Sequence, residues 1–232
     1  MIRGASPALL VAGAAALLLL APGCAREDDE VRTAAAGAEQ TIALPPPQRK
    51  GTLSLEEALA RRASVRDFST TPLTEAELGQ LLWAAQGISH DGTLRTAPSA
   101  GALFPLELYV AMAGGVFHYD PARHALERRG RDDVRAALSR AALEQESVRD
   151  APAVFVITAV SRRTAAKYGA ARSPRYVYLE AGHAAQNLLL QATALGLGGV
   201  LVGAFHDDAS RRALDLAVEE EPLYLLPVGH PR

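Results

Sequence analysis

The chain has 232 residues, of which 49% are hydrophobic and 22% are charged, so it can build a packed core and is not wholly disordered. Its length suits one domain with short appendages, and its net charge of −2 gives no general attraction to nucleic acid or to anionic membranes. One cysteine excludes an internal disulfide and a cysteine-based zinc site. We predict no metal and no nucleic-acid partner, although a histidine–carboxylate site built from distant loops stays open.

Residues 1–24 have the pattern of an export signal. Arg3 gives a positive start, and an apolar run from Ala8 to Leu20 follows, which is short for a membrane span. The segment ends in "APGC", similar to the site at which bacterial lipoproteins are cleaved and lipidated on the cysteine. We expect an exported lipoprotein, periplasmic or on the outer cell surface, held at a membrane by a lipid anchor on Cys24. A plain secretory signal and an uncleaved anchor are the alternatives.

Residues 25–52 have the composition of a disordered tether. They open with the charge run from Arg26 to Glu30, continue through alanines and contain three consecutive prolines at 45–47, with no apolar period. The folded domain is therefore predicted to span residues 53–232.

Capping boxes, apolar periodicity and turn residues predict the elements of this domain. In chain order they are a helix over 54–61, a helix over 74–86 that Gly87 stops, a loop over 88–105, a hairpin of strands 106–113 and 116–119, a helix over 132–143, a buried strand over 153–160, a long helix over 175–195 that Gly196 stops, a buried strand over 200–205, a helix over 207–218 and a last strand over 223–228. Helices and strands intermingle irregularly, which predicts an α+β fold with a mixed central sheet flanked by helices.

Three segments have residues suited to binding a ligand. Residues 61–66 place arginine guanidinium groups around the Ser64 hydroxyl, an arrangement that suits a phosphate monoester. The alternative is a solvent-exposed basic turn that binds no ligand. Residues 97–105 are small, so their backbone can approach a flat ligand, and Ser99 can donate to a ring carbonyl, unless this is an ordinary loop. The glycines from Gly196 to Gly203 follow a helix and precede a strand, the reverse of a dinucleotide fingerprint, but Gly203 can present its N–H to a ligand.

Lys167 and Tyr168 form a candidate acid–base pair. The chain has only two lysines among its 24 basic residues, and a buried lysine, unlike an arginine, can give up its proton near neutral pH. The pair therefore predicts proton transfer, with an ordinary surface lysine as the alternative.

Five stretches together resemble the nitroreductase-like flavoenzymes, and within them the SagB-type (thiazoline/oxazoline) dehydrogenases. They are "RRASVRDFS", "LGQLLWAAQGIS", "TAPSAGALFPLELYV", "KYGAARSPRYVYLEAGHAAQNLLLQATALGLGGVLVGAF" and "LYLLPVGHP". The resemblance covers roughly residues 53–229. It implies a nitroreductase-like fold that binds FMN noncovalently at the interface of an intertwined homodimer.

The resemblance also implies roles for individual residues. The FMN phosphate would be bound by Arg62, Ser64, Arg66 and the backbone of Ala63. The flavin ring would be lined by Pro98, Ser99, Ala100, Gly101, Val202 and Gly203, with the Gly203 N–H near N5. Lys167 and Tyr168 would remove a substrate proton while a hydride passes to N5. On the long helix, His183, Gln186 and Asn187 would be structural.

The implied function is an FMN-dependent oxidoreductase that oxidises a small-molecule or peptide substrate, such as an azoline ring. An NAD(P)H-dependent nitro- or quinone reductase and a non-catalytic flavin-binding lipoprotein are the alternatives. The chain ends shortly after the last predicted strand, so only His230 or Arg232 can give the phosphate the second cation that related proteins take from a basic tail.

Overall fold

The computed structural model describes residues 40–232, which fold around a seven-stranded sheet. The strand order is β1-β6-β5-β4-β7-β9-β8, and all neighbouring strands pair antiparallel. The strands are β1 (Thr41–Ala43), β4 (Leu106–Met112), β5 (Gly115–Asp120), β6 (Ala125–Gly130), β7 (Ala153–Ala159), β8 (Gly198–Gly199) and β9 (Glu221–Gly229). The α+β prediction is confirmed, but the sheet is antiparallel and not mixed, because β4, β5 and β6 follow one another as hairpins and the helical connections also return the chain in the opposite direction.

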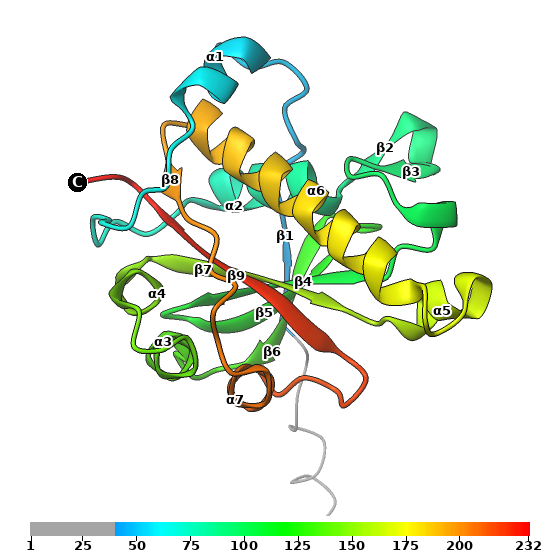
Figure 1. The fold of residues 1–232 in the computed structure, drawn as a ribbon. Coiled ribbons are helices and arrows are strands. Elements are labelled where there is room, and N and C mark those ends of the chain that lie inside the picture. The colour runs from blue at the N-terminus through cyan, green and yellow to red at the C-terminus, as the bar shows by residue number, and fades with distance from the viewer. Residues whose placement is uncertain (1–39) are drawn as a thin grey trace, which may run out of the picture. The chain divides into compact units, whose positions relative to one another are not determined.

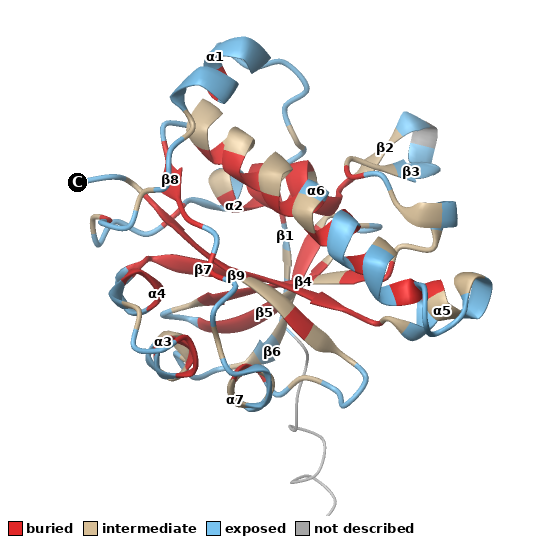
Figure 2. Ribbon diagram, viewed as in Figure 1, coloured by how far each residue is buried: buried red, intermediate tan, exposed pale blue. Residues whose placement is uncertain are grey.

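Helices cover both faces of the sheet. Helices α2 and α6 pack on one face, and α3, α4 and the α7 region pack on the other (Figure 1). The helices are α1 (Leu55–Arg61), α2 (Glu75–Gln86), α3 (Arg135–Ala141), α4 (Glu146–Asp150), α5 (Arg162–Tyr168), α6 (Ser173–Ala194) and α7 (Asp207–Ala213). Figure 2 shows the buried residues along β7 and along the sheet-facing side of α6. Within the described residues, no helix is long and apolar enough to cross a membrane.

Local sequence signals fix several helix ends. Both predicted capping boxes are present, at Ser54 with Glu57 and at Thr74 with Glu77. Gly196 ends the turn after α6 with φ of +75°, a conformation that favours glycine. Gly87 also ends its helix as predicted, but with an extended backbone, at φ of −65°.

The ordered domain begins earlier than predicted. Residues 40–52 are not a free tether, because β1 pairs with β6, Leu44 is buried, and the backbone N–H of Gln48 donates to Oε1 of Gln80 at 2.8 Å. The edge of the sheet binds β1 through backbone hydrogen bonds, which leave little trace in side-chain periodicity. The predicted export signal with Cys24, and residues 25–39 of the predicted tether, lie outside the described residues.

Other differences concern short or irregular elements. The strand predicted over 200–205 is wrong, since only Val202 forms a bridge there, with Leu225. Strand β6 and helices α4 and α5 were not predicted, because β6 carries charged residues and the two helices have seven residues or fewer. The loop predicted over 88–105 contains a small hairpin of β2 (Ile88–Ser89) and β3 (Leu94–Arg95).

Candidate active site

Six of the predicted cofactor residues lie along the β8 edge of the sheet. We call them the edge group: Arg62, Ala63, Ser64, Arg66, Val202 and Gly203. Ser64 forms a parallel bridge with Gly199 of β8, and Val65 N–H donates to the Gly199 carbonyl at 3.0 Å. Three residues further on, Val202 bridges to Leu225 of β9. The edge group therefore combines two distant parts of the sequence beside one edge of the sheet.

A glycine allows this close backbone approach. A Cβ on Gly198 would lie 2.6 Å from the Cβ of Val65, which is too close for any side chain. Gly203, by contrast, is exposed, and its N–H has no hydrogen-bond partner within residues 40–232. The glycine stretch thus has two distinct roles here: it seats the 62–66 segment, and it leaves one N–H facing outward.

The charged side chains of the edge group are available to a ligand. In the described part of the chain, Arg62, Ser64 and Arg66 make no side-chain hydrogen bond or ion pair, and Arg66 is exposed. The C-terminus runs alongside, with Arg232 Nη1 at 3.3 Å from the Asp67 carboxylate. His230 instead lies 3.6 Å from Glu77. Unpaired guanidinium groups beside a hydroxyl and an exposed backbone fit a phosphate monoester. Arg232 is also near, because it contacts Asp67, the residue that follows Arg66.

The remaining predicted residues form a second cluster, the loop group: Pro98, Ser99, Ala100, Gly101, Lys167 and Tyr168. A Cβ built on Gly101 would lie 3.0 Å from Lys167 Nζ and 3.0 Å from Tyr168 Oη, and Gly101 has φ of +64°. Lys167 Nζ lies 5.6 Å from the centre of the Tyr168 ring. The structure therefore brings both predicted catalytic side chains to the backbone of the small-residue loop.

The loop group is anchored through Thr96 to the two helices beneath it. Thr96 N–H donates to the Gly87 carbonyl at 3.0 Å, and its hydroxyl donates to the Trp83 carbonyl at 2.9 Å. Asn187 of α6 donates to the Thr96 carbonyl at 3.3 Å, which agrees with the structural role predicted for it. Within the loop, Ser99 Oγ accepts from Phe104 N–H at 2.9 Å.

One expectation about Lys167 does not hold within this chain. Its predicted role as a base assumes a buried lysine, whereas the Lys167 side chain is exposed and Tyr168 is half-buried. Tyr168 packs on Tyr176 of α6, with ring centres 4.6 Å apart. The described residues therefore leave the Lys167 side chain open to a ligand or to another chain.

The sequence analysis missed Glu180 of α6, which lies behind the loop group. Only 2% of this residue is exposed, and its Oε1 has no hydrogen-bond partner within the described chain. Burial raises the pKa of Glu180 to about 7. The helical period gave a usable signal, because Glu180 falls on the same face as buried Val177 and Ala184.

The two groups lie at different ends of one helix. The loop group sits by α5 and the first half of α6, whereas the arginines of the edge group sit by α1 and β8, beyond its last turn (Figure 1). A 22-residue helix is roughly 33 Å long. The edge-group arginines and the loop group are thus separated by most of the helix within one chain.

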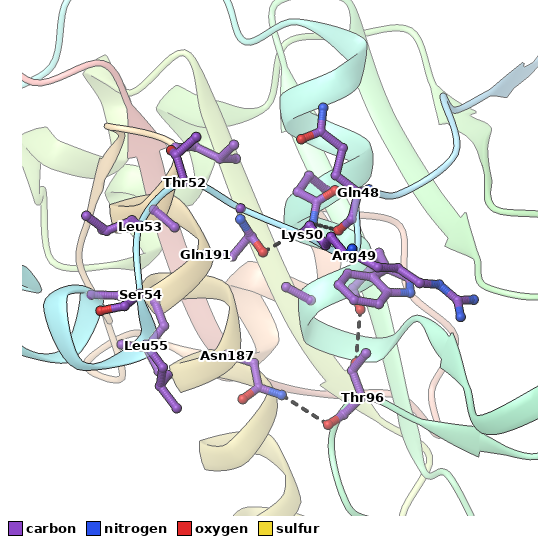
Figure 3. Close-up of a pocket in the computed structure, with 18 residues that line it drawn as sticks. Gln48, Arg49, Lys50, Thr52, Leu53, Ser54, Leu55, Thr96, Asn187 and Gln191 are labelled. Atoms are coloured by element: carbon purple, nitrogen blue, oxygen red, sulfur yellow. Dashed lines mark hydrogen bonds between the residues drawn. The ribbon is translucent and has the colours of Figure 1, made fainter.

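A pocket of the described chain lies elsewhere. It has a volume of about 490 Å³ and lies between the 48–55 segment, α2 and the second half of α6. Figure 3 shows Asn187 reaching from α6 to Thr96 at its floor. No residue of the edge group or the loop group lines it. Within residues 40–232, no group of three or more His, Cys, Asp or Glu side chains is placed to bind a metal ion.

Comparison with known proteins identifies the family. The nitroreductase family matches residues 59–230. A candidate nitroreductase of Methanocaldococcus jannaschii is 44% identical over 183 residues, covering 76% of this chain and 91% of that protein. This chain belongs to the nitroreductase family.

Solved structures agree with this assignment. A candidate nitroreductase of Ralstonia eutropha superposes with a TM-score of 0.76 at 30% identity, covering 84% of this chain and 90% of that one. A microcin synthetase complex of E. coli gives a TM-score of 0.66 at 23% identity, covering 84% of this chain and 79% of that one, a likeness that shows the fold alone. The chain is thus a nitroreductase-family oxidoreductase with the α+β fold of that family.

The buried Glu180 carboxyl predicts a pH-dependent loss of stability. With a pKa of about 7 when folded and 4.5 as the ordinary value, the unfolded chain releases this proton first as the pH rises. The free energy of unfolding is therefore highest below pH 4.5, and between pH 4.5 and about pH 7 it decreases by on the order of 3 kcal/mol. We expect E180Q to lose this part of the decline when unfolding by urea is measured from pH 5 to 8.5.

The control is E56Q, which removes an exposed carboxyl and should keep the wild-type profile. An E180Q protein whose stability falls with pH as steeply as the wild type would contradict the assignment.

Proposed function

We propose that this protein is an FMN-dependent dehydrogenase of the SagB type, which removes a hydride and a proton from an azoline-like ring. The observation that carries the proposal is the meeting of Lys167 Nζ and Tyr168 Oη at Gly101. An amine and a phenol beside a loop that admits a flat ligand are suited to moving a proton. Membership of the nitroreductase family supports flavin chemistry at this place.

The edge group supports FMN as the cofactor. Arg62 and Arg66 would bind the phosphate together with the Ser64 hydroxyl, and the Ala63 backbone lies in the same turn. The exposed N–H of Gly203, next to the buried Val202, would face the flavin ring. A fixed donor at that position stabilises negative charge that builds on a reduced ring.

A homodimer would unite the two groups. One flavin cannot reach from the phosphate-binding arginines to the loop group when most of α6 lies between them. In a symmetric dimer, the edge group of one chain can face the loop group of its partner, and the same contact occurs twice. A partner would also cover the exposed Lys167, as its role as a base requires.

The proposed reaction balances as the loss of two hydrogens from the substrate. When bound, FMN supplies an acceptor for a hydride at N5. Lys167 as the free amine, or Tyr168 as the phenolate, would take the remaining proton from the substrate, so the ring would gain a double bond. An external acceptor must then remove the two electrons from the cofactor. This acceptor need not be a nicotinamide nucleotide, which suits the exported, Cys24-anchored state that we propose for the chain.

An NAD(P)H-dependent nitro- or quinone reductase is the second candidate. The 44% identity to the M. jannaschii candidate nitroreductase favours it. The two functions differ in the electron donor, because a reductase draws electrons from the nucleotide and a dehydrogenase draws them from its substrate.

The edge group predicts that FMN affinity depends on Arg66 through the phosphate. We expect R66A to weaken FMN binding about tenfold or more, because hydrogen bonds to charged groups are worth about 1.5–3 kcal/mol, and to leave riboflavin binding unchanged. Fluorescence titration of the apoprotein with both flavins measures this. R212A removes an exposed arginine outside the edge group and is the control. Equal losses for FMN and riboflavin would argue against a phosphate contact.

The proposed roles of Lys167 and Tyr168 predict that the electrons come from an azoline substrate. Under anaerobic conditions, an azoline peptide should bleach the flavin of the wild type, and K167A and Y168F should bleach roughly a hundredfold more slowly while keeping bound FMN. Stopped-flow absorbance measures the rate. Rapid bleaching by NADH or NADPH alone would favour the reductase, and bleaching by neither donor would favour a non-catalytic flavin-binding protein.

The proposed dimer predicts complementation between two inactive variants. R66A damages an edge group and K167A a loop group, so a mixed dimer has one doubly damaged site and one intact site. Unfolding and refolding an equal mixture should restore turnover at about a quarter of the sites, at an FMN concentration too low to load R66A. If both groups of a site came from one chain, mixing would restore nothing.

A further inference from the structure

The backbone of the loop that meets Lys167 and Tyr168 is strained. Gly101, Ala102 and Phe104 have φ of +64°, +54° and +46°, the left-handed region that residues other than glycine rarely adopt. Such strain persists only where the surrounding structure over-determines the backbone. The contacts that hold this segment therefore decide where the loop lies relative to the two catalytic candidates.

Phe104, at the end of the strained segment, is held by three contacts. Its N–H donates to Ser99 Oγ at 2.9 Å, and its carbonyl accepts from Arg163 Nη1 at 3.0 Å. The guanidinium carbon of Arg95 lies 5.3 Å from the centre of the Phe104 ring. Ser99 and Arg95 belong to the segment that leads into the loop, whereas Arg163 belongs to α5. Of these three contacts, only the one from Arg163 ties the loop to the helix that carries the catalytic candidates.

The Arg163 guanidinium joins α5, the strained loop and the sheet. Its second nitrogen, Nη2, donates to Glu107 Oε1 on β4 at 2.5 Å, and the other carboxylate oxygen of Glu107 lies 2.8 Å from His118 Nε2 on β5. Because a guanidinium is planar and has several N–H donors in fixed directions, it can serve a carbonyl and a carboxylate at once in one orientation. Glu107 is thus held between two strands' worth of partners, and it fixes the guanidinium against the sheet.

Arg163 and Lys167 lie one helical turn apart on α5, and residues four apart share a face of a helix. Arg163 reaches the end of the strained segment, at the Phe104 carbonyl. Lys167 Nζ reaches its start, 3.0 Å from a Cβ built on Gly101. A helix of seven residues is not stable on its own in water. The placement of α5 beside the loop therefore depends on contacts such as that of Arg163.

Resting on the proposed function, we propose that Arg163 is a positioning residue that holds α5 against the strained loop, so that Lys167 and Tyr168 face the substrate proton. Arg163 takes no proton in the reaction, because an arginine stays charged in proteins. It acts through the Phe104 carbonyl and the Glu107 carboxylate. Without it, α5 and the loop can shift relative to each other, and a misplacement of about 1 Å can slow a reaction roughly a hundredfold.

Amide hydrogen exchange in the apoprotein, followed by NMR, tests the contact without flavin. In R163A the amides of Ala102 and Phe104 should exchange roughly tenfold faster than in the wild type, while the amides of β7 keep their rates. The control is R162A, which removes the neighbouring arginine and its exposed ion pair with Glu219 at 3.7 Å, and which should leave both sets unchanged. Unchanged exchange at Phe104, or equal acceleration in β7, overturns the proposal.

The rate of flavin reduction tests the consequence for the reaction. At saturating FMN, R163A should lower the limiting rate of anaerobic bleaching by an azoline peptide roughly tenfold and leave the half-saturating peptide concentration unchanged. R163K keeps the charge but lacks the planar guanidinium, so it should recover only part of the rate. R162A should bleach like the wild type. A wild-type limiting rate in R163A, or full recovery in R163K, overturns the positioning role.

The two experiments separate this proposal from the proposed function. A wild-type protein that no azoline peptide bleaches overturns the proposed function. In that case the exchange rate at Phe104 still decides whether Arg163 holds the loop.

Discussion

Burial of one face of α6 is the interaction on which the candidate site depends. The helix packs its apolar face against α2 and the sheet, and the same packing fixes the polar residues that follow the helical period. Tyr176 packs on the Tyr168 ring, and Asn187 donates a hydrogen bond to the Thr96 carbonyl. After Gly196 the chain turns directly into β8, which seats the 62–66 segment. One packed helix therefore positions both groups of site residues.

Under the proposed function, the length of that helix also makes each chain incomplete as a flavin site. With the edge-group arginines beyond its last turn and the loop group beside its first half, a chain would hold two half-sites that belong to different ligands. In the proposed dimer, flavin binding and association are linked, because a ligand that contacts both chains stabilises the pair. Helix α1 fits this arrangement, since Leu55 and Leu59 are 62% and 54% exposed beside the half-site. Such apolar side chains are suited to a protein contact.

The sequence predicts best where local chemistry decides the structure. The capping boxes at Ser54 and Thr74 and the stop at Gly196 depend on neighbouring residues only, and the apolar run of β7 has a burial pattern that only a central strand explains. Prediction fails where the structure of a segment depends on residues that are distant in the sequence. Strand β1 exists because β6 offers an edge, and the apolar run after Gly199 lines the sheet edge as irregular backbone instead of pairing along its length.

The candidate site divides in the same way. The small-residue loop and the Lys167–Tyr168 pair are visible in the sequence, but their meeting at Gly101 is a consequence of the fold. Glu180 was missed because one glutamate in a polar helix resembles a surface residue until its face is known. Glu180 lies on the buried face of α6, whereas the Lys167 side chain is exposed beside Gly101. In the proposed reaction Lys167 and Tyr168 act on the substrate, so K167A and Y168F should slow flavin reduction without weakening FMN binding, whereas Glu180 acts on the pH dependence of folding stability.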